Sequence, residues 1–317
     1  MKFKGFCAAL LLSMPCVSAS ADINVVASIK PLQLVAAGVL GDLAQPEVLI
    51  PPGASPHHYA LKPSDRRKLA QADLVLWVGP DLETFLEKTL DNSGVKTLTL
   101  LPEEDSHAGE TEEEHAAHQD EHEGHEEHEE EGHHGHDHGG VDPHLWMDPI
   151  EVLHAAEQLT ETLSQQFPEH KAQLESNFIA FSAELINMDK QLKNDLEPLK
   201  NKGFFVFHDA YDRFMKRYEL NQLGFFTVDP GRPVGTRHLA EIREQLQDNA
   251  AVCVFGEPQF KAAVVKAVTE DLPVGYGELD PLALDAEVSP TGYTQYLRHL
   301  GTQVRSCLLN QNQTAKN

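Results

Sequence analysis

The sequence lacks long hydrophobic runs, which excludes a chain that crosses a membrane several times. The run near its start, Phe6–Leu12, is too short for a stable transmembrane helix. This run follows Lys2 and Lys4 and precedes Ala19-Ser20-Ala21, the basic, apolar and small-residue order of a secretory signal peptide. We therefore predict that residues 1–21 are cleaved and that the mature chain is exported without being inserted in the membrane.

Cysteine is also scarce, with four in 317 residues. Cys7 and Cys16 fall within the predicted signal peptide, so Cys253 and Cys307 remain in the mature chain. These two lie far apart and lack the Cys-x-x-Cys spacing of many zinc sites, which makes a role as zinc ligands the weaker alternative. An even pair of cysteines in an exported protein favours a disulfide. We predict that this disulfide ties the last helix to the second domain.

Lysine and arginine are absent from the segment Glu103–His138, which holds ten of the eighteen histidines and sixteen Asp or Glu residues. Its charge of −16 supplies most of the formal net charge of −25 and leaves about −9 for the rest of the chain. Such an acidic protein is poorly suited to bind nucleic acid or an anionic membrane surface. Because the segment has few large apolar side chains to offset the entropy cost of ordering, we expect it to be a disordered loop.

Histidine is a poor choice for a loop that serves only solubility, and imidazole is the commonest protein ligand for divalent transition metals. We interpret the His-rich loop as an auxiliary metal collector, the alternative being a solvated acidic loop. Within it, His118-Gln-Asp-Glu-His122 fits a zinc-peptidase pattern. That chemistry needs a rigid helix, and the pattern arises easily by chance in a segment of this composition.

Two regions of the chain alternate between β-branched runs and helical patterns. Strands are expected at 23–29, 47–50, 73–78 and 97–101 in the first region and at 204–207, 222–226, 252–255 and 273–276 in the second. Strands that alternate with helices predict an α/β fold with two lobes, each a roughly four-stranded parallel sheet with flanking helices.

A long helical pattern separates the two regions. Six large apolar residues recur at steps of four and three and form a stripe that ends before Pro198: Leu174, Phe178, Phe181, Leu185, Met188 and Leu192. A helix of about 30 residues would be about 45 Å long. We predict that this helix, over 166–198, joins an N-terminal lobe (22–165) to a C-terminal lobe (199–317), although an ordinary core helix would show the same pattern.

Candidate metal ligands follow four of the expected strands. His57, beside His58, follows the second strand of the first lobe, and His144 follows its fourth strand beyond the His-rich loop. In the second lobe, His208 ends the first strand and Asp280 follows the fourth. Because ligands of open parallel sheets bind beyond the carboxyl ends of the strands, we predict one metal site between the lobes, with two groups from each.

The residues around these candidates form motifs that resemble a known family. The motifs are Pro56-His57-x-Tyr59 followed by Lys62-Pro-Ser-Asp65, Asp142-Pro-His144-Leu-Trp, Val206-Phe-His208-Asp-Ala-Tyr211, and Leu279-Asp280-Pro281. Together and in this order, they resemble the metal-specific substrate-binding proteins of ATP-driven (ABC) importers, most closely the periplasmic zinc-binding members. The resemblance covers essentially the whole mature chain.

This resemblance implies a function without enzymatic activity. It implies that Zn²⁺ is captured in the periplasm by His57, His144 and His208 and is delivered to the membrane permease of an ABC importer. Asp280 would be either a direct ligand or a nearby counter-charge. Manganese-binding relatives place a glutamate where this chain has His208. We further predict that the protein is a monomer.

Ligand chemistry supports zinc but leaves alternatives. Three neutral imidazoles suit tetrahedral zinc, whereas manganese prefers more oxygen ligands. A carrier of manganese or another divalent metal, a periplasmic metal buffer without a transporter, and a zinc hydrolase remain as rivals, since three histidines and a water also describe a catalytic centre. His58 could compete with His57 for the ion. Because bound imidazoles must be deprotonated, we expect metal affinity to fall as the pH drops through the histidine range.

Overall fold

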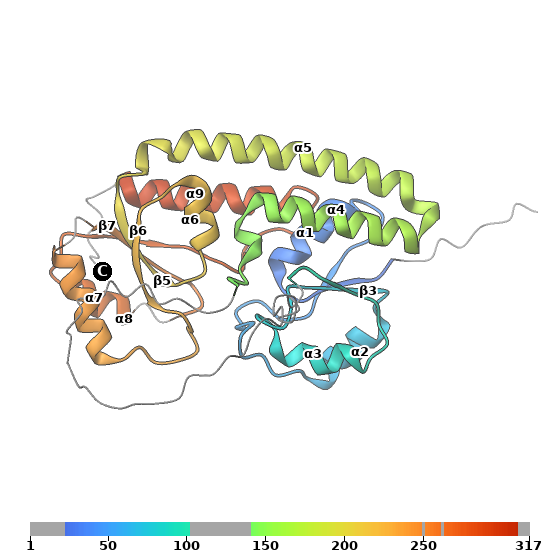
Figure 1. The fold of residues 1–317 in the computed structure, drawn as a ribbon, viewed down its shortest axis with the longest axis horizontal. Helices are drawn as coiled ribbons and strands as arrows, with labels where there is room; N and C mark the ends of the chain where they lie inside the picture. The colour runs from blue at the N-terminus through green and yellow to red at the C-terminus, as the bar shows by residue number, and fades with distance from the viewer. Residues whose placement is uncertain (1–22, 102–140, 249–250, 261–262, 310–317) are drawn as a thin grey trace, which may run out of the picture.

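The computed structural model describes residues 23–101, 141–248, 251–260 and 263–309. The predicted signal peptide and the His-rich loop lie outside these residues. None of the helices within them combines the length and the apolar character that crossing a membrane requires. Two lobes lie side by side beneath a long helix (Figure 1).

The first lobe is built on a four-stranded parallel sheet with the strand order β2-β1-β3-β4. Its strands are β1 (Val25–Ala27), β2 (Glu47–Val48), β3 (Leu74–Trp77) and β4 (Thr97–Thr99), and its helices are α1 (Lys30–Leu40), α2 (Pro63–Gln71) and α3 (Thr84–Asp91). Alternate residues of the strands face opposite sides of the sheet. Val25 and Leu76 join the central core, while Val26 and Trp77 pack with residues of α2 and α3.

The second lobe repeats this plan with the strand order β6-β5-β7-β8, again all parallel. Its strands are β5 (Gly203–His208), β6 (Gln222–Thr227), β7 (Ala251–Gly256) and β8 (Gly275–Glu278), and its helices are α6 (Asp212–Tyr218), α7 (Thr236–Asp248) and α8 (Ala263–Thr269). Phe204 and Phe255 face the central core, whereas Phe205 and Val254 pack with residues of α7 and α8. The predicted fold class is confirmed.

Three long helices cover both sheets on one side. In Figure 1, α5 (Lys171–Leu196) runs across both lobes, with α4 (Pro149–Gln166) beneath it at the first lobe and α9 (Gly292–Leu309) beneath it at the second. Helix α4 begins as its sequence predicts, with Pro149 in its first turn and the Asp148 side chain accepting a hydrogen bond from the amide of Ile150 at 2.8 Å. We refer to α4, α5 and α9 as the spine.

Helix α5 has 26 residues, fewer than the roughly 30 expected, and is about 39 Å long. It is shorter because single 3₁₀ turns flank it at Pro168–His170 and Glu197–Leu199, each with a proline near its start.

Two glycines let α5 approach its neighbouring helices closely. A Cβ at Gly38 of α1 would lie 2.4 Å from the Phe181 ring, and one at Gly301 of α9 would lie 2.4 Å from Leu192.

One cluster of buried apolar side chains is shared by the spine and the inner faces of both sheets. It includes Val25 and Leu76 from the first lobe and Phe204 and Phe255 from the second. The predicted disulfide is present: Cys253 of β7 is bonded to Cys307 of α9. The bond links the second sheet covalently to the spine.

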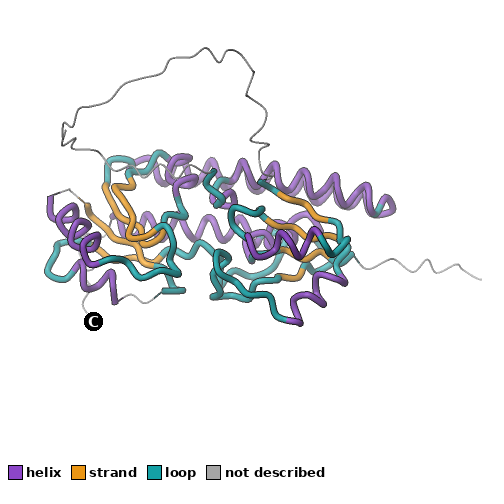
Figure 2. The backbone as a smooth tube through the Cα atoms, turned by 60° about the horizontal axis from the view of Figure 1, so that its bottom comes forward, coloured by secondary structure: helices purple, strands orange, loops and turns teal. Residues whose placement is uncertain are grey.

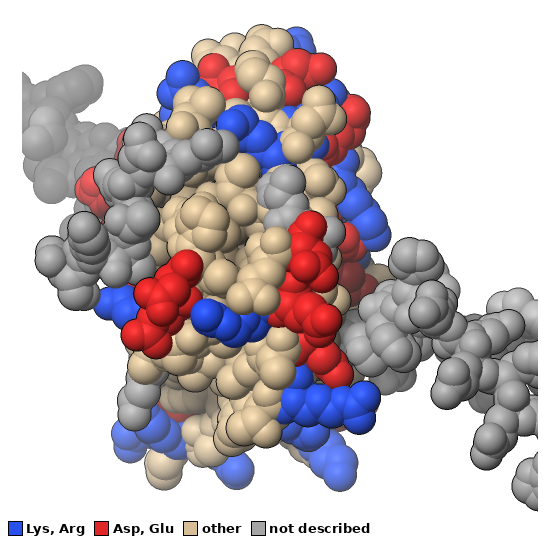
Figure 3. All heavy atoms as spheres, turned by 90° about the vertical axis from the view of Figure 1, so that its left-hand side faces the viewer, with Lys and Arg blue, Asp and Glu red and all other residues tan. Residues whose placement is uncertain are grey.

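On the side away from the spine, the two lobes face each other through their loops. In Figure 2 the loops of the two lobes, drawn in teal, face each other in the middle of the molecule. Figure 3 shows the end of the molecule formed by the second lobe, where small groups of acidic and basic side chains are interspersed around uncharged surface. Among the described residues on this face, no single sign of charge dominates.

Candidate metal centre

Three histidines from distant parts of the chain meet between the lobes. His57 lies in the loop after β2, His144 directly precedes the 3₁₀ turn Leu145–Met147, and His208 is the last residue of β5. Their ring centroids are 5.2 to 5.8 Å apart, and one nitrogen from each ring lies within 4.8 Å of the other two. The parallel sheets place these rings together because strand ends and the loops after them face the same crevice.

The Nε2 atoms of His57, His144 and His208 are buried and have no hydrogen-bond partner among the described residues. Burial, followed by the proximity of His144, lowers the pKa of His57 to about 4. Burial, and then the nearby His144 and His57, hold the pKa of His208 well below its usual value. Both rings are therefore neutral at pH 7, and the fall in metal affinity expected near pH 6.5 is displaced to lower pH for these two ligands.

Neighbouring groups fix the orientation of two of the rings. The Nδ1 of His144 lies 2.7 Å from Asp142 Oδ1, which also accepts a hydrogen bond from the His144 amide at 3.0 Å. Arg213 of α6 donates to the backbone carbonyl of Asp142 at 2.6 Å. His208 is hydrogen-bonded to the backbone of Val228, and since its Nε2 is unpartnered the bond involves Nδ1. In both rings Nδ1 is engaged, and Nε2 is the nitrogen left without a partner among the described residues.

Asp280 is oriented away from this group. Its Oδ1 accepts hydrogen bonds from Gln259 Nε2 at 2.5 Å and from the Leu282 amide at 2.9 Å, and its Oδ2 accepts one from the Leu284 amide at 2.5 Å. The nitrogens that meet within 4.8 Å of one another belong to the three histidines alone. Asp280 thus organises the loop after β8, and the nearby counter-charge is the one of its two predicted roles that this geometry favours.

Sequence reasoning missed Glu257, which directly follows β7. Its Oε1 lies 3.6 Å from His208 Nδ1 and accepts a hydrogen bond from the Tyr211 hydroxyl at 3.1 Å. The carboxyl is buried, and this burial raises its pKa well above the usual value. Its position at the end of a strand is the same signal that singled out His208, so the strand-end rule could have found it.

His58 points away from the three rings. Its Nε2 lies 2.9 and 3.0 Å from the two carboxylate oxygens of Asp229, which follows β6 in the second lobe. The ring is therefore engaged by a carboxylate, and it is separate from the group formed by His57, His144 and His208.

A cavity of about 90 Å³ lies beside the three rings and is also lined by Trp146, Pro230 and Glu257. A water molecule occupies about 30 Å³ of liquid, so the space is sufficient for an ion and a small ligand. Proteins hold zinc with three imidazoles and a fourth ligand at Zn–N distances of about 2.0–2.1 Å, which places tetrahedral ligand atoms about 3.4 Å apart. Binding of an ion would draw the three nitrogens, which lie within 4.8 Å of one another, closer to this spacing.

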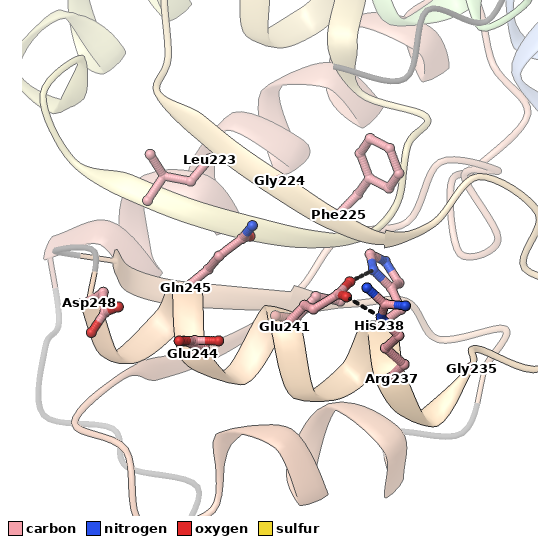
Figure 4. A pocket seen from close by; sticks show the side chains of 11 residues that line it. Leu223, Gly224, Phe225, Gly235, Arg237, His238, Glu241, Glu244, Gln245 and Asp248 are labelled. Atoms are coloured by element: carbon pink, nitrogen blue, oxygen red, sulfur yellow. Dashed lines mark hydrogen bonds and ion pairs between the residues drawn. The ribbon is translucent and has the colours of Figure 1, made fainter. Parts of the chain in front are cut away.

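A larger cavity of about 800 Å³ lies between the edge strand β6 and helix α7 (Figure 4). Three of its charged or titratable groups pair with one another: Glu241 accepts a hydrogen bond from Arg237 at 3.0 Å and lies 3.7 Å from His238. Leu223 and Phe225 line its other side (Figure 4). Among the described residues this cavity has no converging set of metal ligands, so the smaller cavity is the candidate site.

Comparison with known proteins identifies the family. Residues 25–307 match the family described as "Zinc-uptake complex component A periplasmic", or ZnuA. The chain belongs to this family. The resemblance predicted from the four motifs is confirmed.

Two ZnuA relatives cover nearly the whole chain. The "High-affinity zinc uptake system protein ZnuA" of Yersinia pestis is 39% identical over 310 residues, which cover 95% of this chain and 95% of the relative. The protein with the same description from Haemophilus ducreyi is 42% identical over 302 residues, covering 94% of this chain and 97% of the relative.

Solved ZnuA structures share the fold. A crystal structure of ZnuA superposes with a TM-score of 0.71 at 25% identity and covers 90% of this chain and 99% of that chain. The crystal structure of a ZnuA deletion mutant with zinc bound gives a TM-score of 0.69 at 26% identity and covers 93% of this chain and 99% of that chain. The two-lobed architecture is thus that of ZnuA proteins.

Proposed function

We propose that this protein captures Zn²⁺ between its lobes with His57, His144 and His208 and delivers it to the permease of an ABC importer. Membership of a family of periplasmic zinc-uptake components supports the location and the cargo. The relatives described as high-affinity zinc uptake proteins support tight binding. The acidic balance of the chain fits a protein that handles cations and does not bind nucleic acid.

The observation that carries the proposal is the set of three buried Nε2 atoms without hydrogen-bond partners among the described residues. A buried polar atom without a partner costs free energy. Three such atoms on rings that bring one nitrogen each within 4.8 Å of the others are explained if the rings share an ion. Neutral imidazole nitrogens in a tetrahedral arrangement favour zinc over manganese, which prefers oxygen ligands.

Capture is reversible and no reaction follows it. Asp280 and Glu257 are both engaged by hydrogen bonds within the second lobe, from a backbone amide and from the Tyr211 hydroxyl respectively. They stabilise the loops around the ion, and neither is needed as a ligand in this scheme. Turnover of generic ester or peptide substrates by the zinc-loaded protein would instead support the zinc-hydrolase alternative.

Competition calorimetry tests the metal and the ligands together. We expect the wild type to bind one zinc ion more tightly than manganese, and we expect His57→Ala, His144→Ala and His208→Ala each to weaken zinc binding more than about 100-fold, beyond the 10- to 100-fold typical of losing an outer partner of a ligand. His154→Ala, which removes an exposed histidine of α4, is the matched control and should leave affinity unchanged. Equal affinities for zinc in all four variants would refute the assignment.

The His-rich loop supplies the auxiliary part of the proposal. Its composition favours several weaker sites that raise the local zinc concentration near the cleft. Deleting residues 103–138 should lower the number of zinc ions bound while sparing the tightest site. Loss of the tightest site in this variant would place that site in the loop and not between the lobes.

A further inference from the structure

Two loops from different lobes meet over the cavity that holds the three histidines. Ser55 and Pro56 line it from the first lobe, and Pro230 lines it from the second. Immediately beside these residues, His58 Nε2 lies 2.9 and 3.0 Å from the carboxylate oxygens of Asp229. These two residues are 171 positions apart in the sequence and belong to different lobes, so this contact joins the lobes.

The pair lies at the solvent side of the cavity. The side chain of His58 is 51% exposed and that of Asp229 is 21% exposed, whereas His208 is 5% exposed. On the spine side the same cleft is closed by buried hydrogen bonds from Trp146 Nε1 to the Pro281 carbonyl and from the Tyr293 hydroxyl to the Trp146 carbonyl, both at 2.7 Å. At the mouth, the exposed contact between His58 and Asp229 joins the two lobes.

The second lobe presents Asp229 in a fixed orientation. The amide of Asp229 donates to Thr227 Oγ1 at 3.0 Å, and its Oδ1 accepts from the Gly231 amide at 2.9 Å. His58 packs closely on this turn, since a Cβ on Gly231 would lie 2.5 Å from His58 Cδ2. A glycine at this position therefore permits the His58 ring to reach the carboxylate.

We propose that His58 and Asp229 form a clasp that keeps the two loops together over a bound ion and sets the rate at which zinc leaves. The inference rests on the proposed zinc-binding function and deepens it. In the clasp, His58 holds its loop in place through its contact with Asp229. It does not bind the metal ion itself. In this proposal an ion leaves toward solvent as the loop containing Pro56 and the loop containing Pro230 separate, and the clasp opposes this separation.

Stopped-flow capture of zinc by an excess of a chromogenic chelator measures this rate on the full-length, zinc-loaded protein. We expect His58→Ala and Asp229→Asn each to raise the dissociation rate by about three- to fivefold, the size expected for losing an exposed contact between two side chains. The double variant should release zinc no faster than His58→Ala, because both substitutions remove the same contact. Asp229→Asn keeps the acceptor for the Gly231 amide, so the turn is preserved.

A pair of glycine variants separates the clasp from a general effect of mutation. Gly231→Ala places a methyl group against His58 without altering the His58 or Asp229 side chain, and should raise the dissociation rate as His58→Ala does. Gly235→Ala is the matched control, because a Cβ there meets nothing within 4 Å. It should release zinc at the wild-type rate.

The results distinguish this inference from the proposed function. If the wild type binds zinc tightly but His58→Ala and Asp229→Asn release it at the wild-type rate, the clasp is refuted and the function stands. If only His58→Ala releases zinc faster, His58 acts as a ligand, which also overturns the clasp. If the wild type binds no zinc, the function fails, and hydrogen exchange of residues 53–58 in the metal-free protein still tests the contact: it should be faster in Asp229→Asn than in the wild type.

Discussion

Asp142 Oδ1 lies 2.7 Å from His144 Nδ1, so a carboxylate determines which nitrogen of that ring faces the cleft. Burial alone would raise the pKa of Asp142. The hydrogen bond to His144 outweighs this effect and keeps the pKa of Asp142 below its usual value. Arg213 contributes an ion pair to Asp142 at 3.4 Å. The second lobe therefore helps to orient a histidine that precedes the spine.

We expect Asp142→Asn to weaken zinc binding by about 10- to 100-fold, the range typical of losing a carboxylate partner of a ligand histidine. The amide cannot stabilise a proton on Nδ1 as a carboxylate does. Competition calorimetry checks this, with Asp195→Asn on the exposed side of α5 as the control. Unchanged affinity in Asp142→Asn would mean that packing alone orients the ring.

A second prediction concerns Glu83, which is fully buried between β1 and α3. Its carboxyl accepts hydrogen bonds from Ser28 Oγ and from the amides of Val78 and Gly79. Burial, only partly offset by these bonds, raises its pKa from 4.5 to about 7. The folded state therefore holds the proton more tightly than the unfolded state, and the free energy of unfolding should fall as the pH rises from 4.5 to 7.

The shift corresponds to about 3 kcal/mol across this window. Glu83→Gln keeps the shape but does not titrate, so its stability should depend less on pH by about that amount. Urea unfolding of the metal-free proteins at pH 4.5, 5.5 and 7 provides the comparison. Parallel pH profiles for the two proteins would show that Glu83 does not titrate in this range.

The disulfide gives a third prediction. Cys253 and Cys307 are 54 residues apart in sequence, and joining them restricts the unfolded chain. Replacing both with alanine should lower the free energy of unfolding by about 2–4 kcal/mol. Zinc affinity should change little, because neither cysteine belongs to the three-histidine group. A large loss of affinity would indicate that the link between β7 and the spine also positions the site.

A fourth prediction concerns the contact between α6 and α5. Arg217 donates two hydrogen bonds to the carboxylate of Asp189, at 2.8 and 2.6 Å, and the Tyr218 hydroxyl donates a third at 3.1 Å. Arg217→Lys loses the two-pronged geometry and should lower the free energy of unfolding by about 1.5–3 kcal/mol.

The matched control is Arg298→Lys, which alters the longer and more exposed pair between Arg298 and Glu184 of α5, at 3.4 Å. Exposed pairs contribute less than about 1 kcal/mol. Denaturant midpoints measured at a common slope compare the two variants. If both variants lost the same free energy of unfolding, burial of the Arg217 contact would contribute nothing to stability.

The sequence predicted those features that depend only on hydrophobic periodicity or on a residue's position at the end of a strand. Alternating strands and helices predict two parallel sheets, and the strand-end rule singles out His57, His144 and His208 because topology alone sends those residues to the crevice. The apolar stripe of α5 likewise follows from its helical period.

Contacts that depend on which side chain reaches which partner could not be predicted in this way. Asp280 follows a strand like the histidines, but the amides of the loop after it take both of its oxygens. Asp229 has no distinguishing spacing, and its role emerges only when the lobes are placed together. The ends of α5 were also set by local 3₁₀ turns, which a hydrophobic period does not reveal.

The close seating of Phe181 on Gly38 and of Leu192 on Gly301 has a consequence for transport. Swinging the lobes widely apart would pull apolar side chains out of a core that both share, and each exposed Å² of that core costs about 25 cal/mol. We therefore expect loaded and empty forms of the protein to keep nearly the same arrangement of the two lobes. The angle between the lobes would then differ little between the loaded and the empty form. A permease that discriminates between these forms has to recognise the shape of the short loops at the rim of the cleft.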